Sequence, residues 1–505
     1  MNFLADKTVL ILGLGASGLA LARWCSRFGA HVTVADTRSV PPQREALRLL
    51  APTAAFVRSS MDEALLQVSV PFDMVLKSPG LSPGSMAGVL RAAQARGLVV
   101  GNELSLFAHA LADLKADREY APHVIGITGT NGKTTVTSLT GLLVQRAGKS
   151  VAVAGNIGPT LLDTLGQHLD AEEAGVALPQ VWVLELSSFQ LDGVTNFEPT
   201  VATVLNISQD HLDWHESLAA YAAAKGHVYG ASGAMLLNRD DARVMLSVPV
   251  VAKGKPVRPY RTFGSGEPTR PGDYGIETVN GMAWLARAAD TDETFKRRKG
   301  EDLVVHVQRL MPVDALRIQG RHNACNALAA LALAGAAGCG IGPMLQALRD
   351  YRGEPHRVAS VAVLDDVEYF DDSKGTNVGA TVAALSGLGV DRKVVVILGG
   401  EGKGQDFSPL AEPVMRHARA VVLIGRDAAL IRSALHGADV PLLDADSMAH
   451  AVELAARYAM TGDAVLLSPA CASFDMFRDY AHRADVFCEA VRLRAERSGA
   501  SEAAT

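Results

Sequence analysis

The sequence contains 505 residues, of which 48% are hydrophobic, 20% charged and 5% aromatic, and its net charge is −6. A chain of this length exceeds the size at which one hydrophobic core keeps growing, so roughly two to four domains are expected. The acidic balance, without a sustained basic block, gives a nucleic-acid partner no electrostatic support, and the longest apolar runs are too short or too glycine-rich to insert in a membrane.

The N-terminal stretch "TVLILGLGASGLALA" has the apolar character of a signal peptide, but its glycine spacing and the following "HVTVAD" strand favour the start of a folded βαβ unit. The cysteines are scattered and form no C-x-x-C pair. We therefore expect reduced thiols in a cytoplasmic protein. They are Cys25, Cys325, Cys339, Cys471 and Cys488.

Short β-branched apolar runs alternate with Ala/Leu-rich helical stretches along almost the whole chain, which indicates an α/β fold with parallel sheets. We predict three domains: a Rossmann-like N-terminal domain over 1–101, a central P-loop ATPase-type domain over 102–354, and a Rossmann-like C-terminal domain over 355–492. The small, polar tail 493–505 is predicted to be disordered.

The first motif is "GLGASG", residues 13–18, which matches G-x-G-x-x-G and is followed by Asp36 at the end of the next predicted strand. Glycines let the backbone approach a phosphate, and the carboxylate suits a ribose hydroxyl, so the pattern indicates a nucleotide site. It does not say which nucleotide, and a tight strand-to-helix turn without a ligand is the alternative.

The second motif is "GTNGKTT", residues 129–135, between the predicted strand "VIGIT" and a helix. The strict P-loop template fails by one place, because Ile127 stands where its first glycine belongs. Even so, backbone N–H groups and the helix N-terminus face one anion site. Lys133 could bridge the outer phosphates of a nucleotide, and the Thr134 hydroxyl could bind Mg²⁺.

Two further strands end in groups that suit Mg²⁺: Glu185 closes "VWVLEL" and His211 follows "VATVLNIS". Both would reach the phosphates if their strands flank the strand of the loop. The alternatives are a structural histidine and a helix cap in "DHLDWH". Lys225 lies in the alanine-rich helix "SLAAYAAAKGHVY", where a solvated lysine is the default reading.

A polar, Gly/Pro-rich segment, "FGSGEPTRPGDYGIETVNG", predicts turns and short antiparallel strands within a longer insert around 253–310 that has no evident role. The stretch "GRHNACNALAALALAGAAG" that follows predicts a packed helix. Asn323 and Asn326 near its start could cap that helix or read the edge of a nucleobase, and the spacing does not choose between them.

The third predicted domain also presents polar residues after its strands, in "DDSKGTN", "GGEGKGQDF" and "SPACASFD". In open parallel sheets, ligands bind beyond the carboxyl ends of the strands. Lys374, Thr376, Lys403 and Ser473 could together hold an anionic substrate. Taken singly, each also fits ordinary turn and cap chemistry.

These motifs together resemble the ATP-dependent Mur ligases, whose loop pattern G-T-x-G-K-[ST]-[ST] fits "GTNGKTT" fully and explains the failed template. The resemblance covers the chain apart from the insert after about residue 253 and the tail. Within the family, "ELSSFQL", "GNIG", "DSKGTN", "GGEGKG" and "SPACASFD" are most similar to the member that adds D-glutamate to UDP-N-acetylmuramoyl-L-alanine. No D-N-P-R motif of the diaminopimelate- or lysine-adding members is present, and Asn131 replaces the histidine of the L-alanine-adding member.

The resemblance implies a role for each matching position. The uridine diphosphate substrate would contact Gly15, Ala16, Ser17, Asp36, Thr37, Arg38, Ser78, Gly80 and Asn156. ATP would contact Gly129, Thr130, Asn131, Gly132, Lys133, Thr134, Thr135, Asn323, Asn326, Arg357 and Asp372. D-Glutamate would contact Lys374, Thr376, Lys403, Ser473, Phe474 and Tyr480, although Leu and Phe are common in the family at the last two positions.

The resemblance also implies two Mg²⁺ ions, held by Thr134, Glu185, His211 and Lys225, with Lys225 carbamylated so that a cation becomes a carboxylate-like ligand. Lys133, His211 and Lys225 would be the catalytic residues. The expected reaction consumes ATP, forms an acyl phosphate on the substrate and then an amide with D-glutamate, as a step of peptidoglycan precursor synthesis by a monomer. An NAD-dependent oxidoreductase and a non-catalytic nucleotide-binding regulator are the competing readings.

Overall fold

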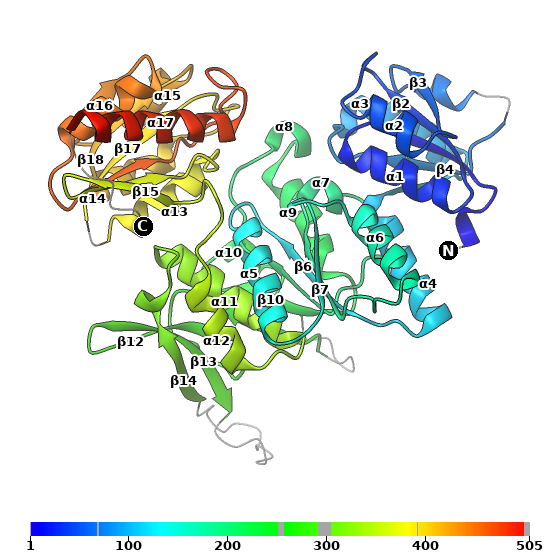
Figure 1. The fold of residues 1–505 in the computed structure, drawn as a ribbon, viewed down its shortest axis with the longest axis horizontal. Coiled ribbons are helices and arrows are strands. Elements are labelled where there is room, and N and C mark those ends of the chain that lie inside the picture. Colours follow the sequence, from blue (N-terminus) through cyan, green and yellow to red (C-terminus); the bar gives the residue numbers. More distant parts are fainter. Residues whose placement is uncertain (1, 68–69, 251–256, 291–304, 391, 499–505) are drawn as a thin grey trace.

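Three parallel-sheet units follow one another along the chain in the computed structural model, which describes residues 2–67, 70–250, 257–290, 305–390 and 392–498 (Figure 1). The N-terminal and C-terminal units lie on opposite sides of the central one. The α/β class with three parallel-sheet units is confirmed. Within the described ranges, the helices lack the combination of length and apolar character that crossing a bilayer requires.

The N-terminal sheet has the strand order β3-β2-β1-β4-β5, with all neighbours parallel. This is the order expected of a Rossmann-like unit. Its strands are β1 Thr8–Leu12, β2 His31–Asp36, β3 Ala55–Arg58, β4 Met74–Lys77 and β5 Val99–Asn102. Its helices are α1 Ala16–Arg27, α2 Arg44–Leu50 and α3 Pro83–Ala95. The turn from β1 to α1 needs Gly18, because a Cβ there would lie 2.0 Å from the Gly13 carbonyl oxygen.

The central sheet has the order β11-β10-β9-β6-β8-β7 and is parallel throughout. Its strands are β6 His123–Thr128, β7 Val151–Gly155, β8 Val181–Glu185, β9 Val201–Val204, β10 Ala234–Asn238 and β11 Tyr260–Phe263. The helices of this unit are α4 Glu103–Arg118, α5 Lys133–Arg146, α6 Leu161–Glu173, α7 Ser188–Leu191, α8 Leu212–His215, α9 Leu218–Gly226, α10 Ala242–Met245, α11 Arg321–Ala336 and α12 Ile341–Asp350. Strand β6 carries the P-loop and lies between β8 and β9, so the expectation that these strands flank it is confirmed.

The Gly/Pro-rich segment 263–281 contains β12 and the turn to β13 of an antiparallel sheet with the order β12-β13-β14, so the predicted turns and antiparallel pairing are confirmed there. The strands are β12 Tyr274–Val279, β13 Met282–Asp290 and β14 Val305–Pro312. The parts of the insert at 251–256 and 291–304 lie outside the described residues.

The C-terminal sheet has the order β15-β16-β20-β17-β18-β19, in which only the edge strand β15 is antiparallel to its neighbour. The strands are β15 Ala359–Leu364, β16 Val367–Asp371, β17 Val394–Gly399, β18 Ala418–Ile424, β19 Leu442–Asp444 and β20 Ala464–Leu467. The helices are α13 Val378–Leu388, α14 Ala411–His417, α15 Ala428–Ala434, α16 Met448–Tyr458 and α17 Tyr480–Ser498.

The prediction of a disordered tail from residue 493 is wrong for its first six residues, which continue α17 to Ser498. Arg494 and Arg497 both form ion pairs with Glu453 of α16, at 2.9 and 2.6 Å. Ala495 is buried in the hydrophobic core that α16 and α17 form with the C-terminal sheet. These contacts order a segment whose composition alone predicts disorder. Residues 499–505 lie outside the described part of the chain.

The N-terminal and central units share one hydrophobic core, which is formed where α1 and α4 meet α6. Glu103, the first residue of α4, is buried in this junction and accepts a hydrogen bond from the Leu162 amide at 3.1 Å. Burial raises the pKa of the Glu103 carboxyl to about 7. The junction between the two units therefore contains a carboxyl group that is costly to ionise.

Replacing Glu103 with Gln should therefore stabilise the protein at pH 8 and not at pH 4. The folded-state pKa lies above the ordinary value of 4.5, so ionisation costs stability as the pH rises from 4.5 to about 7, and the amide does not ionise. The gain in thermal midpoint over wild type should grow across that window and then level off. Glu45→Gln, at an exposed position on α2, is the control, and a pH-independent gain in Glu103→Gln would contradict the assignment.

Candidate functional site

The P-loop lies between β6 and α5 and begins the helix without a side-chain cap, which leaves its first amides free for an anion. Gly132 is the N-cap and has φ +83°, in the left-handed region. A Cβ at this glycine would lie 2.8 Å from the Asn326 side-chain oxygen of α11. The loop therefore needs glycine both for its backbone conformation and for the close approach of α11.

Asn206, just after β9, holds the P-loop and carries no motif that sequence analysis could have used. Its side chain accepts from the Asn131 amide at 2.8 Å and donates to the Asn131 carbonyl at 3.0 Å. Its own carbonyl accepts from the Thr130 amide at 2.9 Å. The Asn206 side chain thus pairs with both the backbone N–H and the backbone C=O of Asn131, as the backbone of an adjacent β-strand would.

Two lysines, the half-buried Lys133 and the buried Lys225, converge on one backbone oxygen of this loop. Lys133 and Lys225 each donate to the Gly129 carbonyl at 2.8 Å, and Lys133 also donates to the Thr130 carbonyl at 2.8 Å. Burial lowers the pKa of both amines, and the effect on Lys225 is strong and is increased by the charge of Lys133. The interpretation of Lys225 as a solvated lysine, made from the sequence, is wrong, because this residue is 1% exposed.

Glu185 ends β8 beside these lysines and is 1% exposed. Its Oε1 accepts from the Asn156 amide group at 2.7 Å, while its buried Oε2 has no hydrogen-bond partner. A buried carboxylate oxygen without a partner is costly unless a cation or a donor occupies the adjacent space. Glu185 therefore fits the side of a cation site, and Asn156 orients it.

His211 is the N-cap of α8 with φ +54°, as the helix-cap alternative expects, but its side chain makes no capping bond, so capping does not account for the imidazole. Its ring packs edge-on against Phe189, with centroids 4.7 Å apart, and lies 3.7 Å from the Asp210 carboxylate. Burial lowers the pKa of His211, and Lys133 and Lys225 lower it further against the opposing charge of Asp210. The neutral imidazole suits a metal ligand.

A cavity between the central and C-terminal units brings together seven of the residues predicted to contact ATP: Asn131, Gly132, Thr135, Asn323, Asn326, Arg357 and Asp372. Arg357 crosses from the C-terminal unit to donate to the Thr134 hydroxyl at 2.7 Å. Burial raises the pKa of Asp372 to about 7, although the Ser468 hydroxyl donates to it at 2.7 Å.

The helix-cap alternative for Asn323 and Asn326 is wrong, because Gly320 is the N-cap of α11.

Both asparagines lie within the first turns of α11 and their side chains are linked, with the Asn326 amide donating to Asn323 Oδ1 at 3.0 Å. Asn326 also lines an adjoining cavity with Asn238, Phe263 and Cys325. The two cavities share His322, Asn206 and Asn326, so space for an anion at the P-loop continues into a more apolar recess.

The residues predicted to contact D-glutamate are only partly gathered. Thr376 and Lys403 line one cleft with Asp210 and His211. Lys374 lies in the cavity at the P-loop instead, with its amine 3.6 Å from the centre of the Tyr480 ring. Ser473 is buried, whereas Phe474 is 65% exposed and lies beneath the Lys403 amine at 5.9 Å.

The predicted uridine-nucleotide residues lie at the carboxyl ends of β1, β2 and β4, except Asn156, which follows β7 in the central unit. Asp36 ends β2 and accepts from the Leu14 and Arg38 amides and from the Arg38 guanidinium, at 2.8–2.9 Å. These donors outweigh burial and lower the pKa of Asp36 to about 2. Gly15 is the N-cap of α1, Ala16 and Ser17 begin the helix, Thr37 follows β2, and Ser78 and Gly80 follow β4.

The loop after β4 also touches the element that carries His211. The Trp214 indole of α8 donates to the Leu81 carbonyl at 3.2 Å, and the Trp214 ring packs on Phe189 at 4.8 Å. The N-terminal strand ends and the central site are therefore joined through an aromatic cluster.

Comparison with known proteins agrees with this arrangement. Residues 7–101 match the model described as Mur ligase MurD-like, N-terminal domain, residues 127–334 match Mur ligase middle domain, and residues 356–471 match Mur ligase, glutamate ligase domain. The chain belongs to the Mur ligase family.

The relatives identify a particular branch of that family. The chain is 65% identical, over 99% of both chains, to the UDP-N-acetylmuramoylalanine–D-glutamate ligase of Albidiferax ferrireducens, and 56% identical, over 96% of both, to the enzyme of that name from Burkholderia vietnamiensis. Among solved structures, MurF ligase from Thermotoga maritima in complex with ADP has a TM-score of 0.57 at 15% identity, covering 98% of this chain and 96% of that one. That likeness shows the shared fold.

Asn206→Asp should raise the KM for ATP at least tenfold. The substitution keeps the acceptor for the Asn131 amide, loses the donor to the Asn131 carbonyl and adds negative charge beside a phosphate site. Initial rates at varied ATP would measure the change. The matched control is Asn196→Asp, which loses one similar bond, to the Ser105 carbonyl, far from the loop. Equal KM values for ATP in the two variants would contradict the role of Asn206 in holding the P-loop.

Proposed function

We propose that this chain is an ATP-dependent ligase that joins D-glutamate to UDP-N-acetylmuramoyl-L-alanine through an acyl phosphate, in peptidoglycan precursor synthesis. The observation that carries the proposal is the convergence of Lys133, Lys225 and Glu185 around one loop, next to a cleft that His211 lines together with Thr376 and Lys403. The 65% identity to a ligase of this name over 99% of both chains supports the choice of substrates.

Each part of the chain binds one reactant in this proposal. Residues 1–101 bind the uridine diphosphate at Gly15–Ser17, Asp36–Arg38, Ser78 and Gly80. Residues 102–354 bind ATP at Gly129–Thr135, with Asn323 and Asn326 beside the base. Residues 355–492 bind D-glutamate at Lys374, Thr376 and Lys403, while Arg357 and Asp372 complete the nucleotide site. Ser473, Phe474 and Tyr480 belong to the same amino-acid region.

The donor set fits Mg²⁺ in part. Glu185 Oε2 is a buried carboxylate oxygen without a partner, and the Thr134 hydroxyl and His211 imidazole lie at the same edge of the sheet. Across the described residues, no group of three or more His, Cys, Asp or Glu side chains is arranged to hold a metal ion. Phosphate oxygens and a modified Lys225 would complete the sets, and bound Mg²⁺ would offset the charge of the reacting phosphates.

Lys225 suits carbamylation. Its amine is buried beside a second lysine, and both the burial and the neighbouring charge disfavour an ammonium ion, although the amine donates to the Gly129 carbonyl and has the Tyr221 ring 4.4 Å away. A neutral amine attacks CO₂ to form a carbamate and releases one proton, which replaces the neutral amine of this pocket with an anion. The anion then pairs with Lys133 and offers oxygen ligands.

The protein's own groups account for the steps that join the two acids. The L-alanine carboxylate attacks the γ-phosphorus of ATP, the bond from that phosphorus to the β,γ-bridging oxygen breaks, and an acyl phosphate and ADP are formed. Lys133 at the P-loop offsets the repulsion between the two reacting anions. The D-glutamate amine then attacks the acyl carbon, phosphate leaves from the tetrahedral intermediate, and the amine loses its proton. The acyl phosphate must be kept from water, so the cleft between the central and C-terminal units has to close over it, with the amino acid entering last.

Phosphate release from ATP, measured with UDP-N-acetylmuramoyl-L-alanine, Mg²⁺ and a panel of amino acids, tests the function. We expect release with D-glutamate and not with L-glutamate or the other amino acids. Release with another amino acid would retain the ligase class but contradict the roles of Lys403 and Ser473. No release with any of them would contradict catalysis itself.

Lys225→Ala should abolish ligation while leaving the thermal midpoint close to that of wild type, because the variant loses both the carbamate and the burial cost of the amine. A short-chain carboxylate added to the variant should restore part of the rate. Near-normal ligation without the added acid would refute the role of Lys225.

A further inference from the structure

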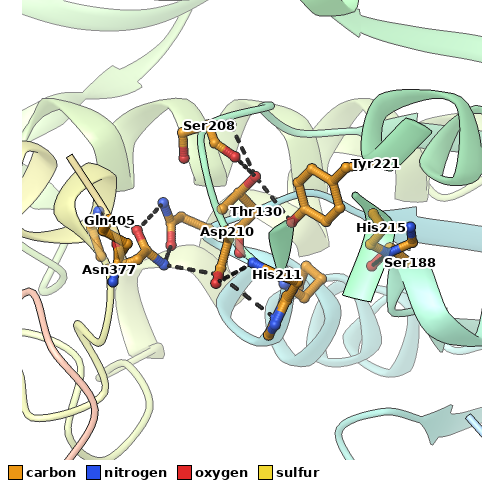
Figure 2. A network of polar contacts seen from close by, with 12 residues as sticks. Thr130, Ser188, Ser208, Asp210, His211, His215, Tyr221, Asn377 and Gln405 are labelled. Atoms are coloured by element: carbon orange, nitrogen blue, oxygen red, sulfur yellow. Dashed lines mark hydrogen bonds and ion pairs between the residues drawn. The ribbon is translucent and has the colours of Figure 1, made fainter. Parts of the chain in front are cut away.

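The first turn of α13 contacts the P-loop through a reciprocal pair of amides (Figure 2). Asn377 donates to Asn131 Oδ1 at 3.0 Å, and Asn131 donates to Asn377 Oδ1 at 3.2 Å. Asn377 is buried and belongs to the C-terminal unit, whereas Asn131 is the third residue of the P-loop motif. The two amides thus join the nucleotide loop directly to the unit proposed to close over it.

The same Asn377 amide reaches the loop that carries His211. Its nitrogen lies 3.3 Å from Asp210 Oδ2, to which it donates, and Asp210 Oδ1 accepts from the His211 backbone amide at 3.0 Å. Figure 2 shows Asn377 and His211 on opposite sides of Asp210. A shift of α13 relative to the central unit would therefore change the position of Asp210 and, through it, of His211.

Gly379 lets α13 approach this closely. A Cβ at Gly379 would lie 2.7 Å from the Ser208 hydroxyl, 3.2 Å from the Asn131 amide nitrogen and 3.3 Å from the Ser208 Cβ. The Ser208 hydroxyl is itself buried without a hydrogen-bond partner. A single methyl group here would need the Ser208 hydroxyl to rotate and the Ser208 Cβ to yield by a few tenths of an ångström, whereas a branched side chain would push the helix away from the P-loop.

On the other side, the turn is fixed within the C-terminal unit. Asn377 Oδ1 caps α13 by accepting from the Ala380 amide at 2.9 Å, and Gln405 Oε1 accepts from the Val378 amide at 3.1 Å. Gln405 also donates to the Gly402 carbonyl at 3.0 Å, next to Lys403. The turn therefore moves together with the residues proposed to hold D-glutamate, namely Thr376 and Lys403.

We infer that Asn377, Val378, Gly379 and Ala380 form a closure latch, a positioning element that aligns the P-loop, the His211 loop and the amino-acid cleft when the C-terminal unit docks. The inference rests on the proposed ligase function and adds the residues that set its closed geometry. The latch consists of a few uncharged or singly charged hydrogen bonds and one close glycine contact, so it can open for each round of substrate entry.

Gly379→Val tests the close approach. The branched side chain should hold α13 away from the P-loop and lower kcat for ligation at least tenfold, because small misplacements of reacting groups cost large factors in rate. The KM for the uridine-nucleotide substrate should stay within about twofold, since its proposed contacts lie in the N-terminal unit. Amide hydrogen exchange should rise in the P-loop and α13, and stay unchanged in β1–β5.

Gly342→Val is the matched control. Gly342 is the second residue of α12, as Gly379 is of α13, and nothing lies within 4 Å of a Cβ built there. Both variants carry the same helix-propensity cost. Equal kcat values for the two variants would overturn the closure latch.

Asn377→Asp tests the amide. The carboxylate keeps the acceptor for the Ala380 amide, loses the donor to Asn131 and Asp210, and places a like charge beside Asp210, so kcat should fall at least tenfold. When Asp210→Asn is added, the new amide at position 210 can donate to the new carboxylate at position 377. The fall in kcat caused by Asn377→Asp should therefore be smaller in the Asp210→Asn background than in wild type. Additive losses in the double variant would contradict direct coupling.

Failure of the closure latch and failure of the proposed function give different results. If wild type releases no phosphate with D-glutamate, the ligase function is wrong. If wild type and Gly342→Val ligate D-glutamate and Gly379→Val does so equally well, the function stands and the closure latch is wrong.

Discussion

The backbone carbonyl of Gly129 accepts hydrogen bonds from both Lys133 and Lys225, and the rest of the site depends on this crowding of cations. Two buried amines cannot both carry charge at low cost unless an anion lies between them. A nucleotide phosphate is such an anion, and a carbamate on Lys225 would remove one of the two amines. The neighbouring carboxylates of Glu185 and Asp210 favour the charged amines only in part. The P-loop is therefore suited to bind phosphate.

The sheet order brings the three proposed binding regions to this point. Strand β6 lies between β8 and β9, so Glu185 and the His211 loop flank the P-loop because all three strands end at one edge. The N-terminal unit reaches this edge through Trp214 and Leu81, and the C-terminal unit reaches it through Asn377 and Arg357. A long substrate can thus be held at one end while its carboxylate meets ATP.

Local patterns predicted much of the fold, because abrupt changes from apolar strands to polar loops mark the carboxyl ends of β8, β9, β16, β17 and β20. Motif chemistry also predicted Lys133 and Glu185. Asn206, Asp210 and Asn377 could not be singled out, since their roles come from long-range contacts and not from spacing. The burial of Lys225 and the pairing of Arg494 and Arg497 with Glu453 likewise depend on elements distant in sequence.

The most direct test of this account is ¹³C NMR of the protein equilibrated with ¹³C-bicarbonate, with Lys133→Ala and Lys225→Ala as comparison proteins. A neutral, buried Lys225 amine should give a carbamate resonance in wild type, which should be absent in Lys225→Ala. The resonance should weaken in Lys133→Ala, because Lys133 both disfavours the ammonium form of Lys225 and pairs with its carbamate. A wild-type spectrum without a protein carbamate, at a bicarbonate concentration that supports full activity, would contradict it.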